Sequence, residues 1–297
     1  MVLVLNAFLE IDKYKQMKIS LLIAVLYIFS SRLLLAQQGE LVLKGTEEQR
    51  NIGFWPSKLE LTTELIGVKV DQSHQISIKE IRAVDNLNNP LEMIAGYPYP
   101  TDYFTNQKEI VIGITPPARE AESISVTGVI EYFTVSEALK SELNLTNLQQ
   151  YYHQNLLKEI NGCKLVLIDL RGLSKMQKND ETGYLKKVKE IHQNADVGDD
   201  VDDAKLYLDK AVSDYNYWGG DASKLLHFYR EDPNDAVVAV KIWKDGKTLS
   251  NGASNYGDSY SFSIEESLTP EMRMQIIVKT GDAIQEIPFQ FVDVSLP

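Results

Sequence analysis

Two stretches of the sequence decide the fold: SISVTGVIEYFTV at residues 123–135 and MQIIVKTGDAIQEIPFQFVDV at residues 274–294. Both alternate apolar and polar residues, which is the period of a half-buried β-strand. Each carries a Thr-Gly pair, and each is preceded by a Thr-Pro pair, at Thr115 and Thr269. The offsets between the pairs are 269 − 115 = 154 and 280 − 127 = 153 residues. We therefore interpret the two stretches as matching parts of an internal repeat.

Three further pairs of segments follow the same order along the chain. KEIVIGITPP matches SYSFSIEESLTP, IKEIRAVDNLNNPL matches AVVAVKIWKDGKTL, and KLELTTELIG matches CKLVLIDLRGL. Short alternating runs separated by Pro, Gly and Asn turn signals are typical of antiparallel sandwiches. The sequence predicts a mainly β fold with two Ig-like antiparallel β-sandwich domains, at residues 37–145 and 163–297. Residues 146–162 are expected to form a linker with a short helix.

The second repeat is interrupted at about residues 173–232, where the apolar period changes. Leu185, Val188, Lys189 and His192 fall at i, i+3, i+4 and i+7, which is helical spacing. The second sandwich is therefore expected to carry an insertion of two or three helices. Long insertions into compact domains are often functional.

The N-terminal segment has the pattern of an export signal. From Met17 the chain reads MKISLLIAVLYIFSSRLLLAQ, with a Lys, an apolar run and a small residue before a polar start. We expect residues 1–36 to be a signal peptide with an upstream extension, cleaved after Ala36, and the mature protein to be periplasmic or secreted. A retained membrane anchor is the alternative, and Arg32 near the end of the run leaves it open.

Charge and cysteine content exclude some classes of function. The chain has a net charge of −12, and without residues 1–36 it holds 26 basic and 40 acidic residues, a net charge of −14. Such a chain repels phosphate backbones, so no nucleic-acid partner is expected. The single Cys163 cannot form an internal disulfide, and before an apolar run it is expected to be a small buried hydrophobe. After signal cleavage we expect no stable membrane insertion.

The segments RAVDNLNNPLE, YFTNQKEIVIGITPP and SISVTGVIEYFTVSEA together resemble a group of secreted bacterial proteins with tandem Ig-like β-sandwiches. The closing IPFQFVDVSLP is similar to the last strand of such a domain, and the LLAQ junction resembles signal peptides of Bacteroidetes. The resemblance implies a fold and an envelope location. It contains no catalytic motif, so it implies no site residue.

Aromatic residues in two segments are candidate ligand contacts, because rigid rings suit carbohydrate stacking and protein contacts. They are Tyr97, Tyr99 and Tyr103 in a Pro-bearing loop of the first repeat, and Tyr215, Tyr217 and Trp218 in the insertion. The alternative interpretation is that these rings pack on the sandwiches.

An acidic cluster in the insertion is a candidate Ca²⁺ site. It comprises Asp199, Asp200, Asp202 and Asp203. Calcium prefers oxygen ligands, but the spacing is not that of an EF-hand loop. The alternative is an acidic helix N-terminus that interacts with the helix dipole. No other cofactor is indicated.

Hydrolase motifs are missing from the sequence: it contains neither H-E-x-x-H nor G-x-S-x-G. No catalytic residue is assigned, and the sequence leaves enzyme activity undecided while favouring a non-catalytic role. We expect an extracytoplasmic binding or interaction module with a protein or glycan partner at the cell envelope. The alternatives are a glycan-binding or glycan-hydrolysing protein that uses the insertion, and a structural subunit of an envelope assembly.

Overall fold

The computed structural model is mainly β, with several antiparallel sheets and a group of helices. Its chain forms two compact units. Unit 1 comprises the described residues up to Tyr132 together with Gln285–Pro297, and unit 2 comprises Phe133–Ile284. The residues described are 39–51, 57–94, 103–160, 162–218 and 224–297.

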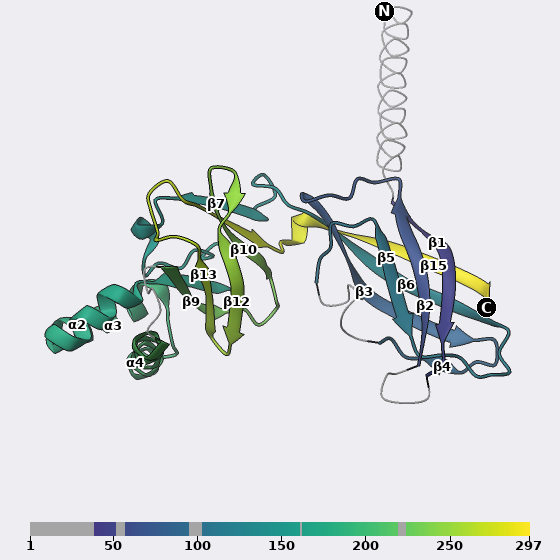
Figure 1. Ribbon diagram of the computed structural model, residues 1–297, viewed down its shortest axis with the longest axis horizontal. Coiled ribbons are helices and arrows are strands. Elements are labelled where there is room, and N and C mark those ends of the chain that lie inside the picture. The colour runs from purple at the N-terminus through teal and green to yellow at the C-terminus, as the bar shows by residue number, and fades with distance from the viewer. Residues whose placement is uncertain (1–38, 52–56, 95–102, 161, 219–223) are drawn as a thin grey trace, which may run out of the picture. The chain divides into compact units, whose positions relative to one another are not determined.

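Unit 1 is built from two sheets, ordered β1-β2-β5 and β15-β6-β3-β4 (Figure 1). Its strands are β1 (Glu40–Gln49), β2 (Lys58–Ile66), β3 (His74–Asp85), β4 (Pro90–Leu91), β5 (Glu109–Ile114), β6 (Ser123–Thr134) and β15 (Ile284–Ser295). Alternate residues of each strand enter one shared core, as the period-2 pattern requires. Leu61 of β2, Ile112 of β5 and Ile130 of β6 are fully buried in it, and Phe289 of β15 joins them.

Unit 2 also has two sheets, ordered β11-β10-β14-β7 and β12-β13-β9-β8. Its strands are β7 (Glu142–Thr146), β8 (Lys164–Ile168), β9 (Leu225–Glu231), β10 (Val237–Lys244), β11 (Lys247–Thr248), β12 (Ser250–Tyr256), β13 (Ser259–Ile264) and β14 (Arg273–Val278). Residues of both sheets, among them Leu165, Phe228, Ile242 and Ile276, form its core. Cys163 is buried in the same core, as the sequence predicts.

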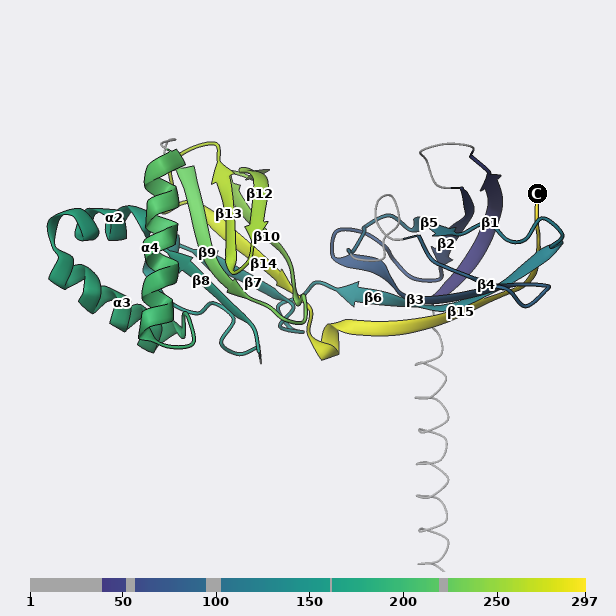
Figure 2. The ribbon, with the colours of Figure 1, turned by 90° about the horizontal axis from the view of Figure 1, so that it is seen from below.

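Three helices cover the outer face of the β8–β9 side of unit 2 (Figure 2). They are α2 (Leu170–Asn179), α3 (Glu181–Ala195) and α4 (Val201–Trp218). A second apolar cluster joins them to the sheet, where Val166 and Tyr229 pack with Val188 and Leu208. The helices thus shield the face of these strands that points away from the main core.

Aspartate N-caps define where α2 and α3 begin. The Asp169 side chain accepts a hydrogen bond from the amide of Gly172, and the Asp180 side chain accepts one from the amide of Gly183, both at 2.9 Å. An N-cap of this kind satisfies a helix amide that has no partner within the helix.

Strand pairing is alike in the two units. The pairs β3–β4, β3–β6, β2–β5 and β1–β2 of unit 1 correspond to β10–β11, β10–β14, β9–β13 and β8–β9 of unit 2. This agrees with three of the four segment matches made from the sequence. The fourth differs, because CKLVLIDLRGL forms β8, the counterpart of β1, whereas KLELTTELIG forms β2, whose counterpart is β9. The helices therefore occupy the place of the β1–β2 connection.

The helical insertion also differs in extent from the expected residues 173–232. Its helices run from Leu170 to Trp218, and Leu225–Glu231 is strand β9. LLHFYRE carries a run of buried residues, which periodicity does not distinguish from a helix segment.

The two units exchange strands, so their boundaries differ from the expected residues 37–145 and 163–297. Strand β7 follows β6 in the chain but pairs with β14 of unit 2. Strand β15 follows β14 but joins the sheet of β6 in unit 1. Residues 146–162 are not a free linker either, because His153 and Leu156 donate backbone hydrogen bonds to β8. The expected short helix is the 3₁₀ turn Leu148–Tyr151.

Within the described part of the chain, no helix combines the length and apolarity that a membrane crossing requires. The expected signal peptide at residues 1–36 lies outside the described residues.

Candidate functional site

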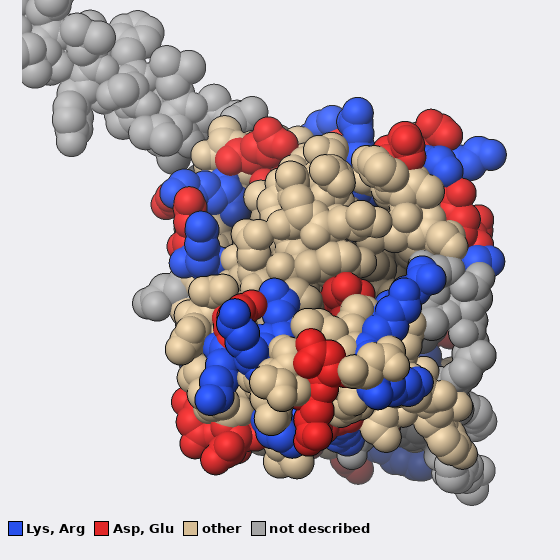
Figure 3. All heavy atoms as spheres, turned by 90° about the vertical axis from the view of Figure 1, so that its left-hand side faces the viewer, with Lys and Arg blue, Asp and Glu red and all other residues tan. Residues whose placement is uncertain are grey.

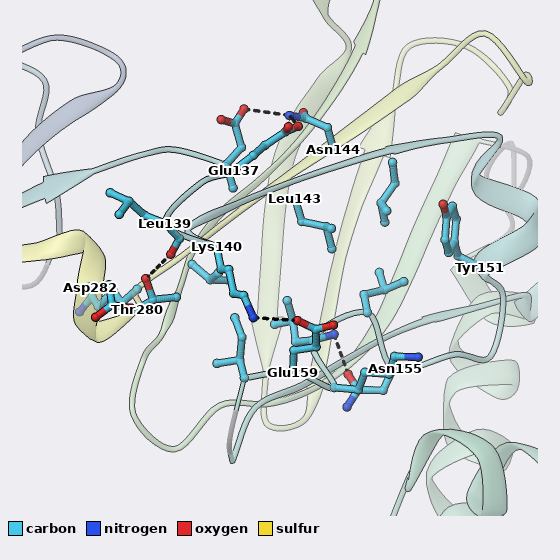
Figure 4. A pocket seen from close by; sticks show the side chains of 18 of the residues that line it. Glu137, Leu139, Lys140, Leu143, Asn144, Tyr151, Asn155, Glu159, Thr280 and Asp282 are labelled. Carbon is cyan, nitrogen blue, oxygen red and sulfur yellow. Dashed lines mark hydrogen bonds and ion pairs between the residues drawn. The ribbon is translucent and has the colours of Figure 1, made fainter.

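A pocket of about 750 Å³ opens in unit 2 beside the edge strand β7 (Figure 4). On one side lie β7 and the turn before it, and on the other lies the segment 151–160. The end of β14 and the turn after it close one end. Leu143 of β7 points across the pocket toward Asn155 and Glu159 of the facing segment (Figure 4).

The pocket has an apolar part made of aliphatic side chains, and polar and charged side chains line the rest of it. Leu143, Leu156 and Ile160 are half-buried against the core of unit 2, and Leu139 and Val278 complete the apolar lining. Clefts of ~300–1,000 Å³ with an apolar lining and a few polar groups are the usual form of ligand sites. The pocket has the size of this class and an aliphatic part, with more polar groups than is usual.

The two edge strands of unit 2 differ in how their outer edges are covered. β8 is last in its sheet, and the following backbone contacts cover it: His153 N to Leu167 O at 2.8 Å and Leu156 N to Leu165 O at 2.9 Å. β7 is last in the other sheet. At its outer edge a side chain contacts the backbone: Gln150 Nε2 donates a hydrogen bond to the Thr146 carbonyl at 3.3 Å.

Polar groups lie around the mouth of the pocket. Lys140 Nζ reaches across to Glu159 Oε2 at 3.3 Å, and both side chains are exposed (Figure 4). An exposed pair of this kind contributes ~0–1 kcal/mol. At the closed end Thr280 Oγ1 donates to the Leu139 carbonyl at 2.8 Å. The mouth can therefore open at small cost while its closed end is held.

Two carboxylates share one neutral donor at the outer edge of β7. The Asn144 amide nitrogen donates to Glu137 Oε1 at 2.9 Å and to Glu142 Oε1 at 3.0 Å. Gln275 Nε2 donates to Glu142 at 2.6 Å. Among the described residues, no Lys or Arg lies within ion-pair distance of either carboxylate. Within the described part of the chain, this edge therefore carries two carboxylates without a paired cation.

The structure describes the side chains of three of the six aromatic residues chosen from the sequence, Tyr103, Tyr215 and Tyr217. Tyr97 and Tyr99 lie outside the described residues, as does the side chain of Trp218. Tyr103 is exposed in unit 1. Tyr215 packs half-buried against the helical cluster, whereas Tyr217, two residues on, is 81% exposed. Residues two apart on a helix face different directions, so these rings do not form one platform.

The acidic cluster lies at the beginning of α4. Asp200 accepts hydrogen bonds from the amides of Asp202 and Asp203, at 2.8 and 2.9 Å, and so caps the helix. Asp199 is exposed beside it. Among the described residues, no group of three or more His, Cys, Asp or Glu side chains has metal-binding geometry. The structure thus gives Asp200 the capping role, and a Ca²⁺ site stays a prediction from the sequence.

A buried polar contact fixes α4 to β9. Tyr207 Oη lies 2.8 Å from His227 Nε2, and burial lowers the pKa of His227 to about 4. Burial also raises the pKa of Tyr207. The imidazole is therefore neutral at neutral pH, and its tautomer decides whether the Tyr207 hydroxyl donates to Nε2 or to the Phe228 carbonyl, which lies 3.3 Å away. Lys164 adds ion pairs to Asp196 and Glu231, at 2.7 and 2.9 Å, which tie the helices to the sheet.

Unit 1 has a second hollow, of about 420 Å³, on the sheet that contains β15 and β6. Glu80 and Arg82 line it beside Phe289. Gly128 stands under the ring, where a Cβ would lie 2.4 Å from the Glu80 carbonyl oxygen. The glycine thus allows close packing, and the hollow offers less apolar surface than the pocket of unit 2.

Sequence reasoning missed the pocket because its residues were divided between the first sandwich, the linker at residues 146–162 and the second sandwich. Leu143 and Leu145 alternate in ELNLT, and Leu156, Leu157 and Ile160 recur soon after. A free linker would be polar, so this density of aliphatic residues was the available signal. Its partner across the pocket, Val278, lies more than one hundred residues away, and local patterns do not reveal such contacts.

Comparison with known protein families, with curated proteins and with solved structures gave no match. On the face that carries α2 and α3, acidic and basic side chains are interspersed (Figure 3). Because no comparison gave a match, the pocket beside β7 is defined as a site by its geometry and chemistry alone.

Proposed function

We propose that this protein is a non-catalytic binding module of the bacterial envelope, exported by the signal peptide expected at residues 1–36. Its two units are Ig-like sandwiches, an assignment supported by their shared strand-pairing pattern. The pocket beside β7 in unit 2 is the ligand site. The single observation that carries this proposal is the apolar pocket of about 750 Å³ next to an edge strand with two uncompensated carboxylates.

The chemistry of the pocket favours binding over catalysis. Its floor is aliphatic, and an apolar ligand group placed there gains ~25 cal/mol for each Å² removed from water. The rim supplies amide and carboxylate groups that orient a ligand. In binding sites, apolar surface commonly provides affinity and polar groups fix the orientation. The aromatic surface on the insertion, required by the glycan alternative, is divided between a half-buried and an exposed ring.

The proposal is tested by methyl NMR of the mature chain, residues 37–297, with labelled leucines. Extended peptides, oligosaccharides and fatty acids are titrated separately. We expect one class to shift the methyl signals of Leu139, Leu143 and Leu156. Shifts confined to signals near Tyr215 and Tyr217, or no shift with any class, would contradict the proposal.

A pair of matched variants controls for unspecific effects. Leu143→Trp fills the pocket and should abolish the methyl shifts of Leu139 and Leu156. Leu206→Trp places the same ring on the exposed side of α4, where the native leucine is 71% exposed, and should leave them unchanged. Equal effects of the two variants would mean that the shifts do not arise in the pocket.

A further inference from the structure

We infer that the ligand is an extended peptide segment of a partner protein that adds a strand to the outer edge of β7, with apolar side chains alternating with basic ones. This inference rests on the proposed function and names the ligand class of the same pocket. Strand addition is one of the recurring ways in which sheets bind peptides.

The first step is the direction of the backbone groups of β7. The strand pairs antiparallel with β14, and Val278 N donates to Ser141 O at 3.0 Å. Bonded and non-bonded pairs alternate along an antiparallel ladder. The N–H and C=O groups of Glu142 and Asn144 therefore point away from β14. In the described part of the chain, these groups have no hydrogen-bond partner.

The second step is the position of the pocket relative to this edge. The side chains of Leu143 and Leu145 face inward and line the pocket, whereas Glu142 and Asn144 flank its edge. Successive residues of a strand point to opposite faces. On a strand added to β7, every second side chain would therefore enter the apolar pocket.

The third step is charge. The intervening side chains of an added strand lie on the face of Glu142 and Asn144, within reach of cross-strand pairing. Glu137 and Glu142 share the Asn144 amide there, and no Lys or Arg of the described chain lies within ion-pair distance. A Lys or Arg of the incoming strand supplies the missing cation. A charge-assisted hydrogen bond of this kind is about twice as strong as a neutral one.

The fourth step is access to the edge. The Lys140–Glu159 pair spans the mouth, with both side chains more than 70% exposed. Such pairs are weak and are screened by salt. The facing segment stays in place because it is bonded to β8 through His153 and Leu156. An entering strand therefore displaces an exposed ion pair and leaves the other wall of the pocket intact.

The experiment measures binding of fluorescein-labelled synthetic peptides to the mature chain by fluorescence anisotropy. The probe SVKLRVT alternates apolar and basic residues. SVELEVT reverses the charge, and SVLVKRT has the composition of the probe without its alternation. We expect both controls to bind at least roughly tenfold more weakly, the equivalent of one lost charged hydrogen bond. Equal affinity for the three peptides would overturn the inference.

The variant Asn144→Pro removes the outward N–H at the middle of the edge. Proline is tolerated on an edge strand where the N–H faces solvent, so the β14 ladder is kept. We expect roughly tenfold weaker binding of the probe. The variant Asn144→Ala loses the side-chain amide that Glu137 and Glu142 share but keeps the N–H, so it should bind the probe more tightly than Asn144→Pro does.

A second route does not depend on the folding of a variant. N-methylation of alternate amides of the probe removes the donors that would bond to the Glu142 and Asn144 carbonyls. Methylation in the register facing β7 should abolish binding, and methylation in the other register should not. Binding that is indifferent to register excludes strand addition.

The two proposals fail in different ways. Methyl shifts in the pocket with a lipid or sugar, without probe binding, would overturn strand addition and leave the binding function standing. No pocket shift with any class would contradict both.

Discussion

Unit 1 and unit 2 share a strand-pairing pattern but complete it differently. The sheet edge next to β6 is filled by β15, a strand of 12 residues, whereas the matching edge next to β14 is filled by β7, a strand of 5 residues. The β1–β2 connection in unit 1 spans only residues 50–57, whereas its counterpart in unit 2 holds three helices. The long edge strand closes its unit over a core, and the short one leaves a pocket beside it. Under the proposed function, this difference at an edge separates a structural unit from a binding unit.

Removal of residues 285–297 should have the largest effect on this comparison. It deletes the buried side chains Ile287, Phe289 and Phe291 from the core of unit 1. At ~1.5–3 kcal/mol each, their loss amounts to roughly 5–9 kcal/mol, close to the whole stability of a typical domain. Hydrogen exchange should show loss of protection in β2 and β6, with β10 and β14 still protected.

The control for this truncation replaces outward residues of the same strand. Gln290→Ala with Val292→Ala should leave both units protected, since both side chains are exposed. Loss of protection in β14 instead of β6 after truncation would assign β15 to unit 2, as the sequence repeat first indicates.

Gly128→Val should destabilise unit 1 by about 3 kcal/mol, the upper end of overpacking effects. A Cβ at this position would lie 2.4 Å from the Glu80 carbonyl oxygen and 2.6 Å from the Phe289 ring. Thermal unfolding of unit 1 measures the loss. Gly45→Val is the matched control, because no atom lies within 4 Å of its Cβ position, and it should stay within ~0.5 kcal/mol. Similar losses for both variants would refute the close approach of β15.

Acid should weaken unit 2 through His227, whose pKa burial lowers from 6.5 to about 4. The unfolded chain binds a proton more readily, so the stability is fully present above pH 6.5 and is lost as the pH falls toward 4. The loss reaches about 3 kcal/mol. His227→Gln should reduce the slope of unfolding free energy against pH between 6.5 and 5. An unchanged slope would show that His227 is accessible to protons in the folded state.

Asp200→Ala should lower the stability of the helical insertion by about 1 kcal/mol, the usual effect of a lost N-cap. Asp199→Ala is its control and should change stability by less than ~0.5 kcal/mol. Circular dichroism during thermal unfolding measures both. Calcium at millimolar concentration should not change either result; a calcium-dependent rise in melting temperature that Asp199→Ala abolishes would favour the metal site.

The sequence was sufficient to predict alternating strands such as β2, because alternation indicates which side chains are buried. Leu59, Leu61 and Leu65 of β2 are buried as their spacing requires. The turn that follows β3 was also predictable: Asp85 accepts hydrogen bonds from the amides of Leu87 and Asn89 within a cluster of turn residues.

An alternating pattern identifies a strand but not its neighbours in the sheet. This explains why the placement of β15 and the pocket beside β7 were not predicted. The pattern of IPFQFVDV fits an edge strand in either unit, so its return to β6 could not be read from it. The pocket has the same origin. Its walls come from Leu143, Leu156 and Val278, which the placement of β7 beside β14 brings together. The aromatic candidates have a related basis, since composition identifies rings but not their neighbours.

The exchanged edge strand has a consequence for the order in which the chain is made. Between Tyr132 and Gln285 lie 284 − 132 = 152 residues, all belonging to unit 2. At ~5–20 residues per second, synthesis of that stretch takes roughly 8–30 s. During this interval the edge of β6 that later pairs with β15 is free, and β7 is the first strand to be synthesised after β6. Strand length favours pairing of β6 with β15 over pairing with β7. Strands β6 and β15 each have 12 residues, whereas β7 has 5, too few to cover the edge of β6.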